Sequence, residues 1–195
     1  MRHTDGNRLH DTCGPLGSPL ERPRVADRTA LRPRTRGQTV DAMPARSFMD
    51  DALEEARRAA AEGEVPIGCV IVREGTIVAR SGNRTLGARD ATAHAEIVAI
   101  RAASSALGTE RLIDCDLYVT LEPCPMCAGA ISLARLRRLY YGASDPKGGA
   151  VDSGVALYGS ATCHHVPEVY GGIGEREAAA LLTAFFRARR SDQSA

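Results

Sequence analysis

One imidazole and two thiols, set far apart along the chain, place the strongest constraint on its fold. The imidazole belongs to His94, and the thiols belong to Cys124 and Cys127, which two residues separate. Cysteines at this spacing bind one Zn²⁺ ion when a helical turn lies between them, and a histidine from a separate element can add a third ligand. The fold must therefore bring two distant segments together, and three protein ligands leave one zinc position open to water.

A carboxylate lies beside this ligand set, because Glu96 follows His94 by two residues. Next to an open zinc site, a carboxylate can take a proton from water and deliver it to a substrate, so the arrangement indicates hydrolysis. Glu96 could instead serve only the dipole of a helix that begins here. His-x-Glu followed by Pro-Cys-x-x-Cys is typical of zinc nucleobase deaminases, which favours the chemical role.

The cysteine pair has two alternative roles, a closed structural zinc site and a redox pair. A closed site needs a fourth protein ligand, for which the chain offers further cysteines and histidines: Cys69, Cys115, Cys163, His164 and His165. None of them forms a second Cys-x-x-Cys, which excludes a two-knuckle zinc ribbon. A redox pair usually follows the first strand of a thioredoxin-like unit, whereas this pair lies late and would leave His94 and Glu96 without a role.

The composition is that of an ordinary globular protein. Of the 195 residues, 44% are hydrophobic and 25% are charged, and the formal net charge of +1 gives no general argument for nucleic-acid binding. No apolar run reaches the roughly 18 residues of a transmembrane helix, so no membrane contact is expected. The cysteine spacing does not match a secreted disulfide scaffold, and we therefore expect a cytoplasmic protein.

The first 46 residues differ from the rest of the chain. They show no hydrophobic periodicity and are rich in arginine and proline. Such a segment buries too little apolar surface to offset its ordering entropy, so we expect residues 1–46 to be disordered or a mis-assigned extension before a start at Met43 or Met49. An RNA-contacting arm and a transit peptide are the alternatives, although acidic residues disfavour the transit peptide. Residues 47–195 are expected to form the zinc-dependent domain.

Apolar periodicity in that domain predicts helices alternating with short strands. Helices are expected at 48–62, 94–107, 124–133 and 175–190, and strands at 67–72, 77–79, 116–121, 138–142 and within 162–169. Asp90 or Thr92 is expected to cap the second helix, and Gly108 to end it. Because strands joined by crossover helices lie parallel, the pattern predicts a partly parallel α/β sheet covered on both faces.

Two longer stretches extend the motif. Residues 92–97 read Thr-Ala-His-Ala-Glu-Ile, and residues 117–130 read Leu-Tyr-Val-Thr-Leu-Glu-Pro-Cys-Pro-Met-Cys-Ala-Gly-Ala. Shorter matches lie at 64–68, 83–84, 111–114 and 185–190. Together these stretches resemble the bacterial tRNA-specific adenosine deaminases over about residues 48 to 190.

The resemblance implies a fold, a reaction and a partner. The fold is the three-layer α/β/α cytidine-deaminase-like fold with a mixed five-stranded sheet. The reaction converts the wobble adenosine, position 34, of the arginine tRNA with anticodon ACG to inosine. The implied enzyme is a homodimer that binds the tRNA anticodon loop and holds one Zn²⁺ per subunit. His94, Cys124 and Cys127 match the zinc ligands, and Glu96 matches the proton shuttle.

The resemblance also assigns two residues to the substrate. Asn83 matches a residue that hydrogen-bonds the flipped nucleoside, and Asp145 matches a loop that meets the anticodon nucleotides. Without the resemblance, both would be interpreted as turn residues, one after Gly82 and the other before Pro146.

Three features leave the substrate open. Residues 150–167, which include Cys163, His164 and His165, depart from the best-known members, and the roles of these three side chains stay open. Some guanine deaminases also carry Glu-Pro-Cys-Pro-Met-Cys, so a deaminase of free guanine, guanosine or cytidine is one alternative. A non-catalytic zinc-folded RNA-binding module is another, which the presence of Glu96 disfavours.

Basic groups for RNA could come from Arg135, Arg137, Arg138, Arg187, Arg189 and Arg190, although helix-terminal charges explain them equally well.

Overall fold

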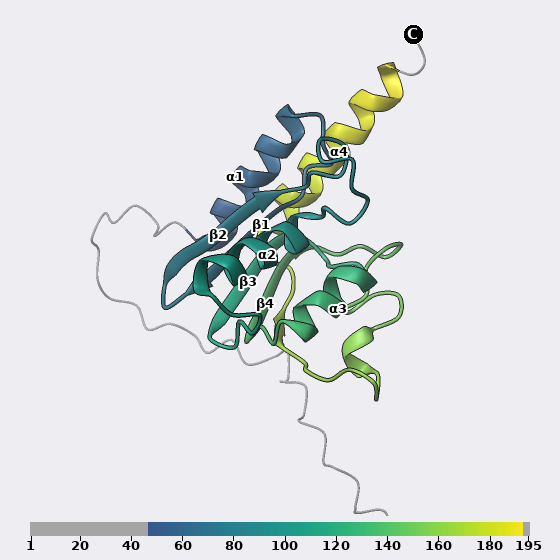
Figure 1. Ribbon diagram of the computed structural model, residues 1–195. Helices are drawn as coiled ribbons and strands as arrows, with labels where there is room; N and C mark the ends of the chain where they lie inside the picture. Colours follow the sequence, from purple (N-terminus) through teal and green to yellow (C-terminus); the bar gives the residue numbers. More distant parts are fainter. Residues whose placement is uncertain (1–46, 193–195) are drawn as a thin grey trace, which may run out of the picture. The chain divides into compact units, whose positions relative to one another are not determined.

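The computed structural model describes residues 47–192, which form a mixed sheet with helices on both faces (Figure 1). The helices are α1 (Phe48–Ala61), α2 (Ala95–Leu107), α3 (Pro125–Leu133) and α4 (Glu175–Asp192), with a short 3-10 helix, η1 (Leu157–Gly159). The strands are β1 (Gly68–Arg73), β2 (Thr76–Gly82), β3 (Cys115–Leu121), β4 (Arg138–Ala143) and β5 (Glu168–Tyr170).

The five strands lie in the order β2-β1-β3-β4-β5. Strand β1 is antiparallel to both β2 and β3, whereas β3, β4 and β5 are parallel. The tight turn between β1 and β2 contains Glu74 and Gly75, both with positive φ, as a two-residue hairpin of matching twist requires. The predicted mixed five-stranded α/β sheet is therefore confirmed.

The helices form two outer layers. Helices α1 and α4 pack on one face of the sheet, and α2 and α3 pack on the other (Figure 1). Successive side chains of β1 point to opposite faces of the sheet. Val70 packs against α1, and Ile71 belongs to the core beneath α2 and α3. Burial on both faces explains why this strand is a continuous apolar run rather than an alternating one.

The sequence of helix α1 contains residues that favour its start and its end. The Ser47 hydroxyl accepts a hydrogen bond from the Asp50 backbone N–H, and the Asp50 carboxylate accepts one from the Ser47 N–H, which completes a capping box. Gly63 follows with φ +80°, a conformation that glycine adopts without strain.

The start of α2 differs from the sequence prediction. His94, rather than Asp90 or Thr92, is the N-cap residue, and its side chain makes no capping hydrogen bond. The Asp90 carboxylate instead accepts hydrogen bonds from the backbone N–H and hydroxyl of Thr92, at 2.8 and 2.7 Å, which close a turn before the helix. The end of α2 at Gly108, with φ +65°, agrees with the prediction.

The last strand is also shorter than the range in which it was expected. Strand β5 occupies residues 168–170, and residues 162–167 form a loop. The loop follows a different course because His165 Nε2 pairs with the Leu136 carbonyl at 2.6 Å, and the Ser132 hydroxyl donates to the His165 carbonyl at 2.7 Å. Residues 162–167 are thus held by the end of α3 instead of by β4.

Residues 1–46, whose character the sequence predicted, lie outside the described residues. Within residues 47–192, no helix is both long and apolar enough to cross a bilayer.

The closest approach between α1 and β1 gives a stability prediction. A Cβ atom at Gly68 would lie 2.0 Å from the Ala52 carbonyl oxygen and 2.4 Å from the Ala56 backbone nitrogen. Because both are backbone atoms, α1 would have to move. We expect Gly68→Ala to lower the free energy of unfolding by about 2 kcal/mol or more in urea denaturation. A Cβ at Gly159 meets nothing within 4 Å, so Gly159→Ala is the control, and equal losses in the two variants would contradict this packing.

Candidate functional site

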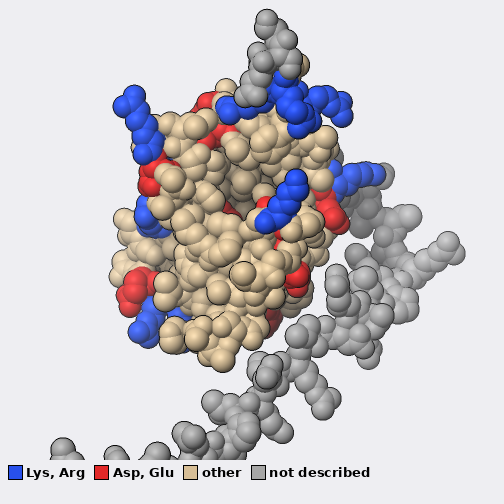
Figure 2. Space-filling view, turned by 90° about the vertical axis from the view of Figure 1, so that its right-hand side faces the viewer, with Lys and Arg blue, Asp and Glu red and all other residues tan. Residues whose placement is uncertain are grey.

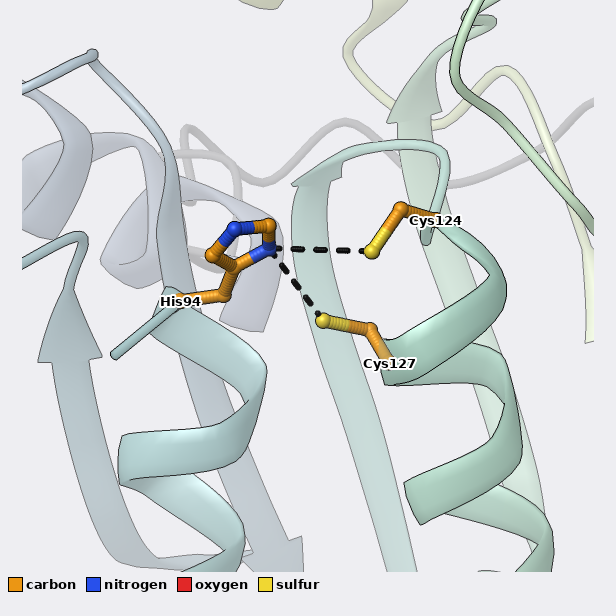
Figure 3. A group of neighbouring side chains, drawn as sticks. All are labelled: His94, Cys124 and Cys127. Atoms are coloured by element: carbon orange, nitrogen blue, oxygen red, sulfur yellow. Dashed lines mark hydrogen bonds between the residues drawn. The ribbon is translucent and has the colours of Figure 1, made fainter. Parts of the chain in front are cut away.

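The two distant segments meet at the N-terminal ends of α2 and α3 (Figure 3). His94 immediately precedes α2, Cys124 immediately precedes α3, and Cys127 lies in the first turn of α3. His94 Nδ1 lies 3.7 Å from Cys124 Sγ and 3.5 Å from Cys127 Sγ. All three atoms are within 4.8 Å of one another, so one ion could contact each of them.

The local sequence explains why Cys124 begins a helix here. Strand β3 ends at Leu121, and Pro125 occupies the first helical position, where its missing N–H would have no partner in any case. Since α2 and α3 pack on the same face of the sheet, their N-terminal ends lie together beside it.

The donor atoms have the spacing of a zinc site. Bonds of about 2.1 Å to nitrogen and 2.3 Å to sulfur, at tetrahedral angles, separate the two atoms by about 3.6 Å. The observed separations of 3.5 and 3.7 Å fit this geometry. Within residues 47–192, none of the other cysteines or histidines joins the group, so the set holds three protein ligands and differs from a closed structural site.

The two thiols differ in protonation. A hydrogen bond from Cys127 lowers the pKa of Cys124 to about 4; burial opposes this shift, and His94 contributes to it. The same hydrogen bond, together with burial, raises the pKa of Cys127. One thiolate is therefore available before metal binding, and the second proton must leave when a metal binds.

Glu96 lies in the first turn of α2 and is only 4% exposed. Burial raises the pKa of its carboxyl group, and the nearby Cys124 adds to the shift, whereas its own backbone N–H and His94 oppose it. A carboxyl group that serves only a helix dipole needs no such burial. A buried carboxyl group beside a metal site is suited to accept and return a proton.

Asn83 follows β2 and is also buried. Its backbone N–H donates to the Ile67 carbonyl at 2.9 Å, and its side-chain Nδ2 donates to Glu64 and Thr85. The next residue, Arg84, donates its N–H to the carbonyl of Ala93, the residue before His94. The structure thus attaches Asn83 to the segment that carries the histidine.

Asp145 follows β4 and is half-buried. Its Oδ1 accepts hydrogen bonds from the backbone N–H groups of Lys147 and Gly148, at 3.1 and 3.0 Å, as in the turn that the sequence suggests. Its own N–H donates to Glu122, two residues before Cys124, at 2.9 Å.

The sequence interpretation assigned no role to Glu122, which directly follows the expected strand at 116–121. This residue is 2% exposed and accepts five hydrogen bonds. The donors are the N–H groups of Asp145, Val151, Asp152 and Ser153 and the Ser153 hydroxyl. Burial acts to raise the pKa of Glu122, but these hydrogen bonds outweigh it and lower the pKa. A charged residue directly after an apolar strand was the available signal.

Residues 150–167, which depart from the best-known family members, pack along α3. The Tyr158 hydroxyl donates to the Ala128 carbonyl at 3.2 Å. Cys163 Sγ donates to the His165 carbonyl at 3.1 Å, and the His165 ring pairs with the Leu136 carbonyl. Cys163 and His165 therefore stabilise this loop, while His164 is exposed.

Several of the candidate RNA-binding arginines have protein partners. Arg137 forms two hydrogen bonds with the Asp116 carboxylate, at 2.8 and 2.9 Å, and Arg138 contacts Glu168 at 2.9 Å. Arg189 donates to the Gly63 carbonyl. Figure 2 shows basic side chains gathered at the top of the molecule, at the C-terminal end of α4. Arg187, in this helix, is exposed.

Comparison with known proteins agrees with this site. Residues 43–143 match the cytidine and deoxycytidylate deaminase zinc-binding region. A tRNA-specific adenosine deaminase from Agrobacterium fabrum is 62% identical over 145 residues, which cover 74% of this chain and 95% of the relative.

Two solved structures are also similar. One comes from a study of A-to-I editing by tRNA:A34 deaminases at the wobble position of transfer RNA. It is 63% identical in sequence with a TM-score of 0.69, and the match covers 69% of this chain and 98% of the solved chain. The other is guanine deaminase from Bacillus subtilis, which is 43% identical with a TM-score of 0.50. This match covers 52% of this chain and 66% of the guanine deaminase chain. The matched zinc-binding region and the near-complete coverage of the Agrobacterium relative show that this chain belongs to the tRNA-specific adenosine deaminases, within the cytidine and deoxycytidylate deaminase family.

Proposed function

We propose that this protein hydrolyses the wobble adenosine, position 34, of the arginine tRNA with anticodon ACG to inosine and ammonia. The observation that carries the proposal is the buried carboxyl group of Glu96 beside a three-ligand zinc set. The relative at 62% identity, a tRNA-specific adenosine deaminase, supports the substrate class.

In the proposed mechanism, His94, Cys124 and Cys127 hold the zinc ion. Zinc in such a set supplies the Lewis acidity that makes water nucleophilic near neutral pH. Glu96 accepts a proton from the attacking water and passes it to the ring nitrogen beside the reacting carbon. It then takes the second proton, from the hydroxyl now attached to the reacting carbon, and delivers it to the amine. The C–N bond breaks as the C=O bond forms, so that adenosine and water give inosine and ammonia. Burial of Glu96 keeps bulk water from competing for these protons.

We further propose that Asn83 hydrogen-bonds the nucleoside and that the turn at Asp145 meets the anticodon loop of the tRNA. Glu122 supports this assignment, because it binds the Asp145 N–H and lies two residues before Cys124. Arg187 is one of several exposed arginines of α4, and together with Arg189 and Arg190 it could approach phosphates.

We also propose that the protein is a homodimer. The outer face of α3 bears no charged side chain and consists of Pro125, Met126, Gly129, Ala130 and Leu133. Leu133 is 72% exposed, which is high for a leucine at the end of an apolar helix face. Small residues along this face would let the same helix of a second copy approach closely.

Two further assignments complete the proposal. Residues 47–195 are proposed to hold the whole deaminase activity. A cytoplasmic location is proposed because the substrate is tRNA, and because Cys69, Cys115, Cys124, Cys127 and Cys163 all have free thiols.

The reaction is tested by measuring ammonia release from five substrates in parallel. An ACG anticodon stem-loop, adenosine, guanine, guanosine and cytidine are offered to the wild type and to Glu96→Gln. We expect turnover of the stem-loop, and a loss of kcat of about a hundred-fold or more in the variant, because one proton-transfer group is removed. The zinc content of the variant should be unchanged. Turnover of a free base with an inert stem-loop would instead indicate a small-molecule deaminase.

Metal content tests the ligand set. We expect about one zinc ion per chain by elemental analysis of the wild type and a strong loss in Cys127→Ala, because a two-ligand site binds zinc weakly. Cys163→Ala is the matched control and should keep its zinc, since Cys163 lies outside the group. Full zinc content in Cys127→Ala would show that the ligand assignment is wrong.

Light scattering after gel filtration tests the dimer. Leu133→Arg should give a monomer, because it places a charge within the proposed apolar contact. Ile113→Arg changes another exposed side chain, 57% exposed, in the turn before β3, and should leave the dimer intact. Dimers of both variants would exclude the face of α3.

Deletion of residues 1–46 tests the domain assignment. The shortened chain should deaminate the stem-loop at the wild-type rate, because every proposed site residue lies beyond residue 46. A large rise in KM would assign the deleted segment to RNA binding.

A further inference from the structure

The side-chain amide of Asn83 is held in one orientation. Its Nδ2 lies 3.2 Å from Glu64 Oε2 and 3.2 Å from Thr85 Oγ1. Glu64 is 2% exposed, and its other oxygen, Oε1, accepts from the N–H groups of Leu86 and Gly87 at 2.8 Å each. An ionised carboxylate only accepts hydrogen bonds, so the amide atom that faces Glu64 must be the nitrogen.

Glu64 is well suited to stay ionised in this position. Burial acts to raise its pKa, but hydrogen bonds from the Gly87 and Leu86 backbone and from the Thr85 and Asn83 side chains outweigh burial and lower it. The Thr85 hydroxyl donates to Glu64 Oε2 at 3.1 Å and therefore accepts from Asn83. This network fixes which end of the amide points away from Glu64.

Both N–H bonds of the Asn83 amide are used within the protein, one by Glu64 and one by Thr85. Among the described residues, nothing donates to Asn83 Oδ1. Every buried side-chain oxygen and nitrogen in this part of the chain has a partner, so Oδ1, which has none, must reach the surface of the protein. The side chain thus offers a ligand a hydrogen-bond acceptor.

We infer that Glu64 is a positioning residue that sets the polarity of Asn83, so that the group of the substrate which Asn83 contacts is a hydrogen-bond donor, a hydroxyl or an N–H. The inference rests on the proposed function, in which Asn83 contacts the nucleoside. A substrate with an acceptor at that point would place two acceptors together and leave both unpaired, which is the strongest form of rejection that a polar pocket has.

Glu64→Gln tests this polarity. The glutamine Oε1 can still accept from Leu86 and Gly87, whereas its Nε2 would face Asn83 and force the asparagine amide to turn over. Asn83 would then present an N–H where the substrate also has a donor. We expect KM for the anticodon stem-loop to rise about ten-fold or more with kcat changed less than about three-fold. Glu62→Gln, the same change at an exposed site, should have no effect on KM.

The double variant Glu64→Gln with Asn83→Asp is the decisive comparison. It keeps the total charge and the shape of the pair. One oxygen of the aspartate would accept from the glutamine, and the other would again offer an acceptor to the substrate. We expect KM to return to within about three-fold of the wild type. A KM as poor as in Glu64→Gln alone would overturn the inference, and so would an unchanged KM in Glu64→Gln.

Two measurements separate this inference from loop folding and from the proposed substrate. Melting temperature and zinc content should stay close to wild type in Glu64→Gln; large losses would show that Glu64 only anchors residues 85–87 and would overturn the inference. In the free wild-type protein, both side-chain amide protons of Asn83 should exchange slowly with water by NMR. Fast exchange of either proton would contradict the network, even if the stem-loop proved not to be the substrate.

Discussion

The loop next to the metal ligands is held in position by hydrogen bonds to the buried carboxylate of Glu122. Glu122 lies between the end of β3 and Cys124, and it collects donors from both ends of the loop at 145–153. A Cβ at Gly149 would lie 2.5 Å from its carboxyl carbon, so the loop can reach it only where no side chain intervenes. An isolated buried charge is costly, but one with five donors is stable and rigid. The loop after β4 is thereby tied to the segment that carries the thiols.

Glu64 holds the loop that leads to His94 in a similar way. It binds the backbone of residues 86–87 as Glu122 binds residues 151–153. Loop geometry on both sides of the site thus depends on hydrogen bonds to a buried side chain, in addition to the apolar packing of residues such as Ala150 and Val151. Backbone N–H groups supply four of the five hydrogen bonds to Glu122. They supply two of the four to Glu64, and side chains of the same loops supply the others.

The fold was largely predictable from sequence, because apolar spacing and glycine positions determine the elements locally. The segment containing His94 and the pair Cys124 and Cys127 could be matched from motif spacing alone. The anchoring roles of Glu64 and Glu122 could not, because each joins residues about twenty or more positions apart whose loops have no periodic pattern. The expected Asp90 cap was wrong for a related reason: the sequence contains a good capping residue, but the chain uses it for a turn.

The beginnings of α2 and α3 show a conflict between stability and chemistry. Both helices start at residues whose side chains make no capping hydrogen bond, namely His94 and Cys124. Serine or aspartate at either position would typically stabilise the helix by about 1 kcal/mol. Such a replacement would remove a donor atom from the metal centre. Selection for heat resistance in this protein must therefore act elsewhere, since these two helix starts would gain from substitution but cannot accept it.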